Sequence, residues 1–364
     1  MSTTKHPSVL AQTVSTPVIL IGGLALIAVL TWAFGSNIFG RTVTEMFIRV
    51  ALVVGMFTFI GNSGVISFGH AGFMCIGAYG SAWLTIPPMM KKVLLPGLSP
   101  MLANAELTFF LSLIIASLFA GVIAFAVGLI LMRLSGIASS IATFAMLAVI
   151  NTIYSNWGPV TGGTSSVVGI PITTGVWISF GGAAAAVVIA YLYGISRSGL
   201  ALRAGRDEAV AAAASGVDIY RERLIAFTIS GALCGMAGVL YAHFLGVVNP
   251  DAFYLGVTFI SLSMLVVGGM SSLSGAVIGV VLISAIIELL RKMEKGITVG
   301  EGTLSLPNGI QEIAIGVVMI VILMFRPGGL TGGAELSLTR TRANDGYSKK
   351  DQGSGNHPDN KPRR

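Results

Sequence analysis

The sequence predicts an all-α polytopic membrane protein with about ten transmembrane helices, some of them short or broken. Hydrophobic residues make up 54% of the 364 positions and charged residues only 10%, whereas soluble domains carry about 25% charged residues. No Asp, Glu, Lys or Arg occurs within 50–90 or 134–196, and both stretches exceed the roughly 20 residues of one membrane span. A chain this apolar cannot cover its surface with polar groups, so a water-soluble enzyme is excluded.

Ten apolar runs, separated by polar or charged breaks, give the expected spans in order. Forty-seven glycines fit this arrangement, because glycine lets membrane helices approach one another closely. The expected spans are Pro17–Phe34, Val43–Ile60, Ile66–Ile86, Leu107–Met132, Ile137–Tyr154, Val176–Gly194, Leu224–Leu245, Val257–Met270, Ser274–Leu290 and Gln311–Phe325.

Two features interrupt this regular pattern. The eighth and ninth spans are short and are separated by the glycine- and serine-rich stretch 268–275, which predicts either two short helices joined by a tight turn or a re-entrant hairpin. The first span follows a short basic region, as a secretory signal does, but its core is longer than the usual 7–15 or so residues and no clear cleavage site follows. We therefore expect the first span to be retained.

Basic residues in short loops indicate which side of the membrane each loop occupies. The loop 196–223 carries five arginines, and 331–364 contains seven Lys or Arg against four Asp or Glu. We expect a cytoplasmic N-terminal segment (1–16), a transmembrane domain (17–330) with a cytoplasmic loop at 196–223, and a disordered cytoplasmic tail (331–364). Both termini are then cytoplasmic, and only Lys91 and Lys92, in an expected outer loop, oppose this orientation.

No set of residues has the spacing of a catalytic or metal site. The sequence lacks a G-x-x-x-x-G-K-[ST] phosphate loop, so ATP hydrolysis by that route is excluded. His70 and His243 have no second ligand at metal spacing, and Cys75 and Cys234 indicate two buried thiols rather than a disulfide framework. We expect no catalytic residue, no metal, no cofactor and no nucleic-acid partner.

Acidic residues are scarce inside the expected spans. Glu45, Glu288 and Glu312 lie near span ends, and Asp251 lies in an outer loop. Ion-coupled carriers place ionisable groups inside the helix bundle, so this pattern weakens the interpretation as such a carrier.

The cytoplasmic loop 196–223 contains a candidate docking helix, from Arg206 to Ser215. Asp207 and Glu208 are expected at its start, where the helix dipole favours negative charge. Five of the next six residues are alanines, and Gly216 ends the helix. The helix either docks into another protein or is an ordinary solvated loop helix.

Four stretches together resemble one known family. The first is 64–73 with 77–79 (GVISFGHAGF and GAY), and the second is 161–163 with 169–171 (TGG and GIP). The third is 198–238, which begins SGLALRA and includes RDE and AASG, and the fourth begins at Gly268 and closes with FRPGGL at 325–330. In this order the stretches resemble the permease subunits of branched-chain amino acid ATP-binding-cassette (ABC) importers, LivM type.

This resemblance implies a permease without catalytic activity that works with several partners. Two separate ATPase subunits, a homologous second permease and a periplasmic substrate-binding protein complete such importers in the bacterial inner membrane. The docking helix would sit in a groove of an ATPase subunit, so ATP-driven closure would move the spans. The coupling residues are then expected to be Arg203, Arg206, Asp207, Glu208, Ala213 and Gly216.

Two further motifs are candidates for the solute route. Ser67, Phe68, Gly69, His70 and Ala71 form either an irregular stretch lining the translocation pathway or a glycine-rich packing seam between helices. The second motif, Thr161-Gly162-Gly163, is expected to shape the periplasmic mouth or to be a plain flexible loop.

The sequence therefore favours a permease subunit that moves branched-chain amino acids or related small solutes. Two alternatives remain. Permeases of the same family carry urea, amides or small aromatic acids, and a stand-alone secondary carrier or channel belongs to a different class. ATP-dependent uptake in vesicles distinguishes that class, and ligand screening of the binding protein distinguishes the solutes.

Overall fold

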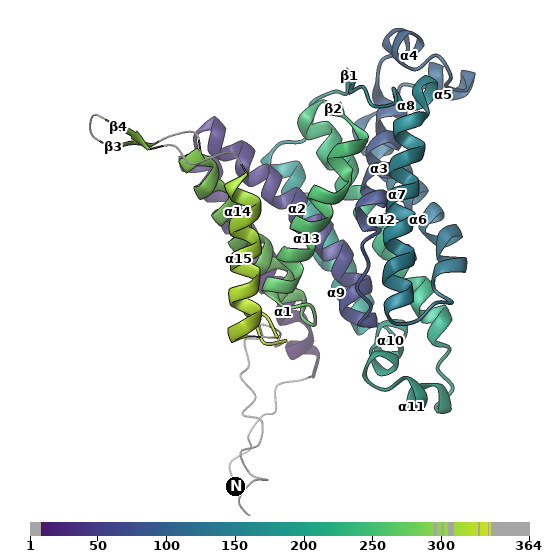
Figure 1. Ribbon diagram of the computed structural model, residues 1–364, viewed down its shortest axis with the longest axis vertical. Coiled ribbons are helices and arrows are strands. Elements are labelled where there is room, and N and C mark those ends of the chain that lie inside the picture. The colour runs from purple at the N-terminus through teal and green to yellow at the C-terminus, as the bar shows by residue number, and fades with distance from the viewer. Residues whose placement is uncertain are drawn as a thin grey trace, which may run out of the picture.

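The computed structural model describes residues 9–294, 297–299, 302–304, 309–326, 328–333 and 335, and these are helical almost throughout (Figure 1). One helix corresponds to each of the ten apolar runs: α1 (Val9–Phe34), α2 (Asn37–Ser63), α3 (His70–Thr85), α6 (Phe109–Leu131), α7 (Ile137–Asn156), α9 (Val176–Ile195), α12 (Ile219–Leu245), α13 (Leu255–Gly268), α14 (Leu273–Glu294) and α15 (Ile310–Phe325).

Shorter elements connect the long helices. They are α4 (Pro88–Leu94), α5 (Pro100–Asn104), α8 (Gly158–Thr161), α10 (Arg197–Asp207), α11 (Ala209–Ala214) and the 3₁₀ helix η1 (Pro250–Phe253). Two small antiparallel sheets complete the described part: β1 (Val167–Val168) pairs with β2 (Val247–Val248), and β3 (Ile297–Val299) pairs with β4 (Gly302–Leu304). In the first sheet Val167 lies opposite Val248.

The predicted class, an all-α polytopic membrane protein, is confirmed. Eight helices in the described part are long and apolar enough to cross a membrane, while α3 and α15 are apolar but have 16 residues each. Helix α3 begins at His70 rather than at Ile66, because Gly64 ends α2 with a positive φ of 71° and the chain from Gly64 to Gly69 is not helical. Of the eighth and ninth spans, α13 alone has 14 residues but forms a 19-residue span with η1 (Pro250–Gly268), and α14 has 22.

Helix α12 lies at the centre of the bundle and packs against α2, α3 and α6. Close approach to α3 depends on glycine: a methyl group on Gly77 would collide with the backbone of Gly235, and one on Gly238 with the carbonyl of Met74. Helix α6 turns its small residues inward, since Ala116, Ala120 and Ala124 are buried, whereas large apolar side chains such as Phe110 are exposed. An apolar exterior around a tightly packed interior is the arrangement a lipid environment requires.

The two ends of the bundle differ in structure (Figure 1). Helices α4, α5 and α8 and the β1–β2 sheet gather at one end, called here the α4 end, and α10 and α11 project from the other, the α11 end. At the α4 end the Lys91 side chain is fully buried, and its amine donates hydrogen bonds of 2.8 Å to the carbonyl oxygens of Trp83 and Leu102, with a third to Ala105. Burial lowers the pKa of Lys91 below its ordinary value, while nearby Glu106 raises it.

The segment after α15 differs from the sequence expectation of disorder from residue 331 onward. Thr331 Oγ1 donates to the Gly268 carbonyl oxygen at 3.0 Å. The Glu335 carboxylate accepts from the backbone amides of Leu273 and Ser274, at 2.7 and 3.1 Å, and so caps the start of α14. The ordered chain therefore extends past the expected boundary. The predictions for residues 1–8 and 336–364 lie outside the described residues.

Candidate functional site

The candidate docking segment folds as two helices rather than one. Helix α10 runs to Asp207, the backbone turns at Glu208 (φ −151°, ψ 100°), and α11 follows from Ala209. Asp207 is therefore at the C-terminal end of α10, not at the start of the docking helix, and Glu208 precedes α11 without a side-chain cap bond. Sequence pattern alone missed this break because strong helix formers lie on both sides of it. Gly216 follows α11 with a positive φ of 86°, in agreement with its expected role as the helix stop.

Both arginines assigned to coupling contact this chain itself. Arg206 Nη1 donates to the Gly61 carbonyl oxygen near the end of α2 at 2.7 Å, and Arg206 Nε pairs with Asp207 at 3.0 Å. Arg203 Nη2 donates to the carbonyl oxygen of Gly194 in α9. Burial lowers the pKa of Arg203, and the neighbouring charge of Arg206 lowers it further. The two side chains thus attach α10 to α2 and α9.

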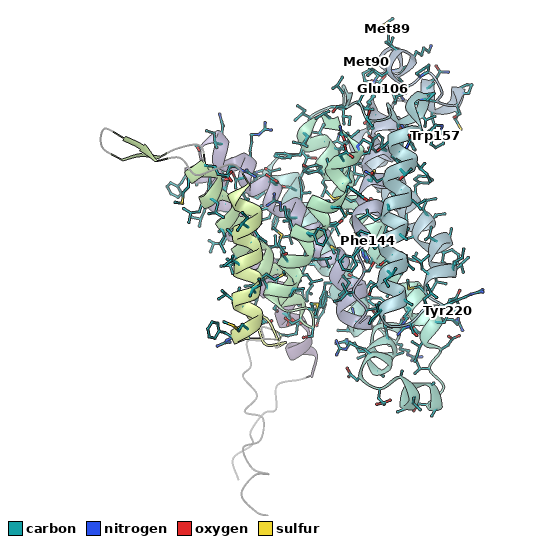
Figure 2. The ribbon with its side chains drawn as sticks, in the orientation of Figure 1. Met89, Met90, Glu106, Phe144, Trp157 and Tyr220 are labelled. Atoms are coloured by element: carbon teal, nitrogen blue, oxygen red, sulfur yellow. The ribbon has the colours of Figure 1, made fainter. Side chains whose placement is uncertain are left out.

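Helix α11 presents a small, exposed surface at its end of the molecule. Val210 is 78% exposed, Ala213 is exposed, and Ala212 is the buried residue of the helix. Tyr220, which begins the return into α12, donates its hydroxyl to the Leu129 carbonyl oxygen of α6 at 3.0 Å and fixes the base of this projection (Figure 2). A rigid base and exposed alanines suit close packing against a second protein.

The stretch from Ser67 to Ala71 lies mostly inside the chain. Ser67, His70 and Ala71 are buried, and the His70 ring contacts the rings of Phe59 and Phe227 at centroid distances of 5.9 and 5.7 Å. Burial of this kind is what a packing seam requires, and a route through these residues would need neighbouring helices to separate.

Phe68 is the exception, because it is only half-buried. Its ring meets Phe144 of α7 at 6.1 Å and Phe259 of α13 at 6.4 Å, both edge to face, and Figure 2 shows Phe144 on the side of α7 toward α13. Phe259 is 52% exposed. Of the five predicted pathway residues, Phe68 is the one the structure leaves partly exposed.

The Thr161-Gly162-Gly163 motif forms an ordered turn at the α4 end. Thr161 is fully buried and donates its hydroxyl to the Tyr154 carbonyl oxygen at 2.6 Å. Gly162 and Gly163 have positive φ values of 77° and 63°, which favour glycine. The structure therefore replaces the expectation of a plain flexible loop with a fixed turn.

Sequence reasoning missed an ion-pair network between α2 and α14. Glu45 pairs with Arg49 at 2.5 Å and with Arg291 at 3.7 Å, while Arg291 also pairs with Glu288 at 3.5 Å. The spacing of Glu45 and Arg49, four residues apart at the start of an apolar run, was the available signal. Within the described residues, no three His, Cys, Asp or Glu side chains are placed to hold a metal ion.

The fold is that of a polytopic membrane protein with a short helix, α11, exposed at one end of the bundle. Residues 38–323 match the family described as branched-chain amino acid transport system / permease component. The chain therefore belongs to this family, whose members are components of ABC transport systems.

Individual relatives agree with this assignment. The high-affinity branched-chain amino acid transport system permease protein LivM of Escherichia coli K12 is 26% identical over 321 residues, covering 79% of this chain and 68% of the relative. The probable branched-chain amino acid transport permease protein LivH of Methanocaldococcus jannaschii is 32% identical over 152 residues, covering 40% of this chain and 46% of the relative. No solved structure gives a significant match.

Proposed function

We propose that this chain is the permease of an importer for branched-chain amino acids in the bacterial inner membrane. Two separate ATPase subunits drive the cycle, a homologous permease forms the other half of the pathway, and a periplasmic binding protein delivers the solute. The α11 end faces the cytoplasm on this proposal, with both termini, and the α4 end faces the periplasm. The LivM and LivH relatives are both named as branched-chain amino acid transport permeases, and this supports the proposed class of solute.

The exposed α11 is the observation that carries this proposal. It projects from the bundle, its base is fixed by Tyr220, and α10 beside it is attached to α2 and α9 through Arg206 and Arg203. A force applied to α11 by an ATPase is thereby transmitted to membrane helices rather than absorbed by a loose loop, as coupling requires.

The orientation has independent support from the arginine-rich segment 197–223, which lies at the α11 end. Short basic loops are retained on the cytoplasmic side. Lys91 opposes this orientation in a simple charge count. Its amine, however, is buried at the α4 end, where it stabilises the fold by donating hydrogen bonds to three carbonyl oxygens.

Purification of the tagged chain from its native membrane, followed by reconstitution with the subunits that co-purify, tests the proposal. We expect ATPase subunits in the complex and ATP-dependent uptake of leucine, isoleucine or valine when binding protein is present. Uptake of urea, amides or aromatic acids instead would show that this permease of the same family carries a different solute. Uptake without ATP would contradict the importer and favour a stand-alone carrier.

The Ala213→Asp variant tests the docking helix directly. Burying a carboxylate in an apolar protein interface without a partner costs several kcal/mol, so we expect loss of ATPase co-purification and of uptake while membrane insertion stays normal. Ala213→Ser, which adds a small uncharged group at the same site, is the control and retains both. Normal ATPase binding and uptake in Ala213→Asp would place the docking surface elsewhere.

A further inference from the structure

A cavity of about 290 Å³ opens between α2, α12 and α13 beside η1. Its rim is polar and its floor apolar, and its volume lies near the lower end for small-ligand pockets, about 300 Å³. The exposed η1 residues Asp251 and Ala252 lie at its edge, whereas Leu52, Met74 and Met264 form part of its buried floor.

The charged groups at this cavity are of opposite sign and partly accessible. About one fifth of each side chain is exposed at Glu45 (21%) and Arg49 (20%), which lie one helical turn apart on α2. Asp251 contributes an exposed carboxylate that forms no salt bridge within the described residues. The cavity thus offers a cation and two anions next to an aliphatic floor.

We propose that this cavity binds an α-amino acid with an aliphatic side chain during its passage through the membrane domain. Arg49 receives the α-carboxylate, Asp251 and Glu45 receive the α-ammonium group, and the apolar floor receives the side chain. This assignment rests on the proposed function and adds a site to it.

The ion-pair network makes such binding feasible without leaving a charge unpaired. When the α-carboxylate takes Arg49, the Glu45 carboxylate keeps Arg291 at 3.7 Å and gains the substrate ammonium. A zwitterion therefore replaces the Glu45–Arg49 pair with one ion pair at its carboxylate and two at its ammonium group. A ligand bearing only one of these charges forms only part of these new ion pairs, so we expect it to bind more weakly than the zwitterion.

Protection of a cysteine at the rim measures binding directly. In the assembled complex, Ala252→Cys in a background of Cys75→Ala and Cys234→Ala is treated with a small water-soluble thiol reagent. L-leucine at ten times its dissociation constant should slow alkylation about tenfold, whereas isoamylamine and 4-methylpentanoate, which lack one charge each, give little protection. Equal protection by all three compounds would overturn recognition of the zwitterion.

Uptake by charge variants tests whether the site is used in transport. We expect Arg49→Gln and Asp251→Asn to lower leucine uptake about tenfold or more, the value of a lost charge-assisted hydrogen bond. The matched control is Glu288→Gln, which removes a carboxylate of the same network that does not line the cavity and should transport normally.

The double variant Glu45→Leu/Arg49→Leu separates a substrate site from a structural ion pair. Replacing both members of an ion pair by apolar residues is often neutral for stability, and Arg291 keeps Glu288. We therefore expect a complex that assembles normally but does not transport. Normal leucine uptake by this double variant would overturn the site. Absence of amino acid uptake in the wild-type importer would instead overturn the proposed function.

Discussion

At the scale of single residues, Lys91 shows how a loop charge can be required by the fold. The segment 88–105 folds over the α4 end, and its two short helices contain too few residues to be stable alone. Lys91 holds them by donating to carbonyl oxygens of Trp83, Leu102 and Ala105, which come from α3, α5 and the residue after α5. The amine replaces water that these buried carbonyl groups would otherwise need.

Replacing this amine should loosen the segment locally. We expect Lys91→Met to lower the free energy of local opening by about 2 kcal/mol, because carbonyl groups lose their donors, and so to speed proteolysis between residues 88 and 105. Limited proteolysis in detergent measures this rate. The control is Lys92→Met at the exposed neighbouring position, and equal cleavage of both variants and wild type would contradict the role of Lys91.

At the scale of elements, α10 links the proposed docking helix α11 to the start of the irregular stretch before α3. Arg206 bonds to Gly61, and its side chain packs over Gly64, where an added methyl group would lie 2.7 Å from Arg206 Cγ. The chain then continues through Phe68 into α3. On the proposed function, a movement of α10 would act first on the junction of α2 and α3.

We expect Arg206→Leu to uncouple ATPase binding at α11 from solute uptake through the membrane helices. Loss of a charge-assisted hydrogen bond to Gly61 should reduce uptake about tenfold, while ATPase subunits still bind, because α11 is unchanged. Co-purification and uptake are measured on the same preparation. Arg197→Leu, at an exposed position of α10, is the control, and loss of ATPase binding in Arg206→Leu would assign this arginine to the interface instead.

At the scale of the whole molecule, the sequence predicts what depends on local pattern. Each span forms its backbone hydrogen bonds within itself, so apolar runs located all ten long helices. The Glu208 break, the Arg206–Gly61 bond across 145 positions and the cavity shared by Glu45 and Asp251 depend on residues distant in sequence. Hydropathy contains no information about such pairs, and therefore the break within the candidate docking segment and the cavity could not be predicted.

The C-terminal segment combines a polar tail with one residue, Glu335, that contacts the bundle. Its composition beyond Leu338 is polar, charged and glycine-rich, which favours little burial, whereas Glu335 binds the first turn of α14 and complements its dipole. We expect truncation after Leu338 to leave uptake and thermal stability nearly unchanged. Loss of complex assembly after truncation at Leu338 would make the tail itself a binding element.

Glu335→Ala should lower the free energy of unfolding by about 1 kcal/mol, the usual value of a helix N-cap. This change is measured as a shift of the thermal unfolding midpoint, and Asp345→Ala is the control.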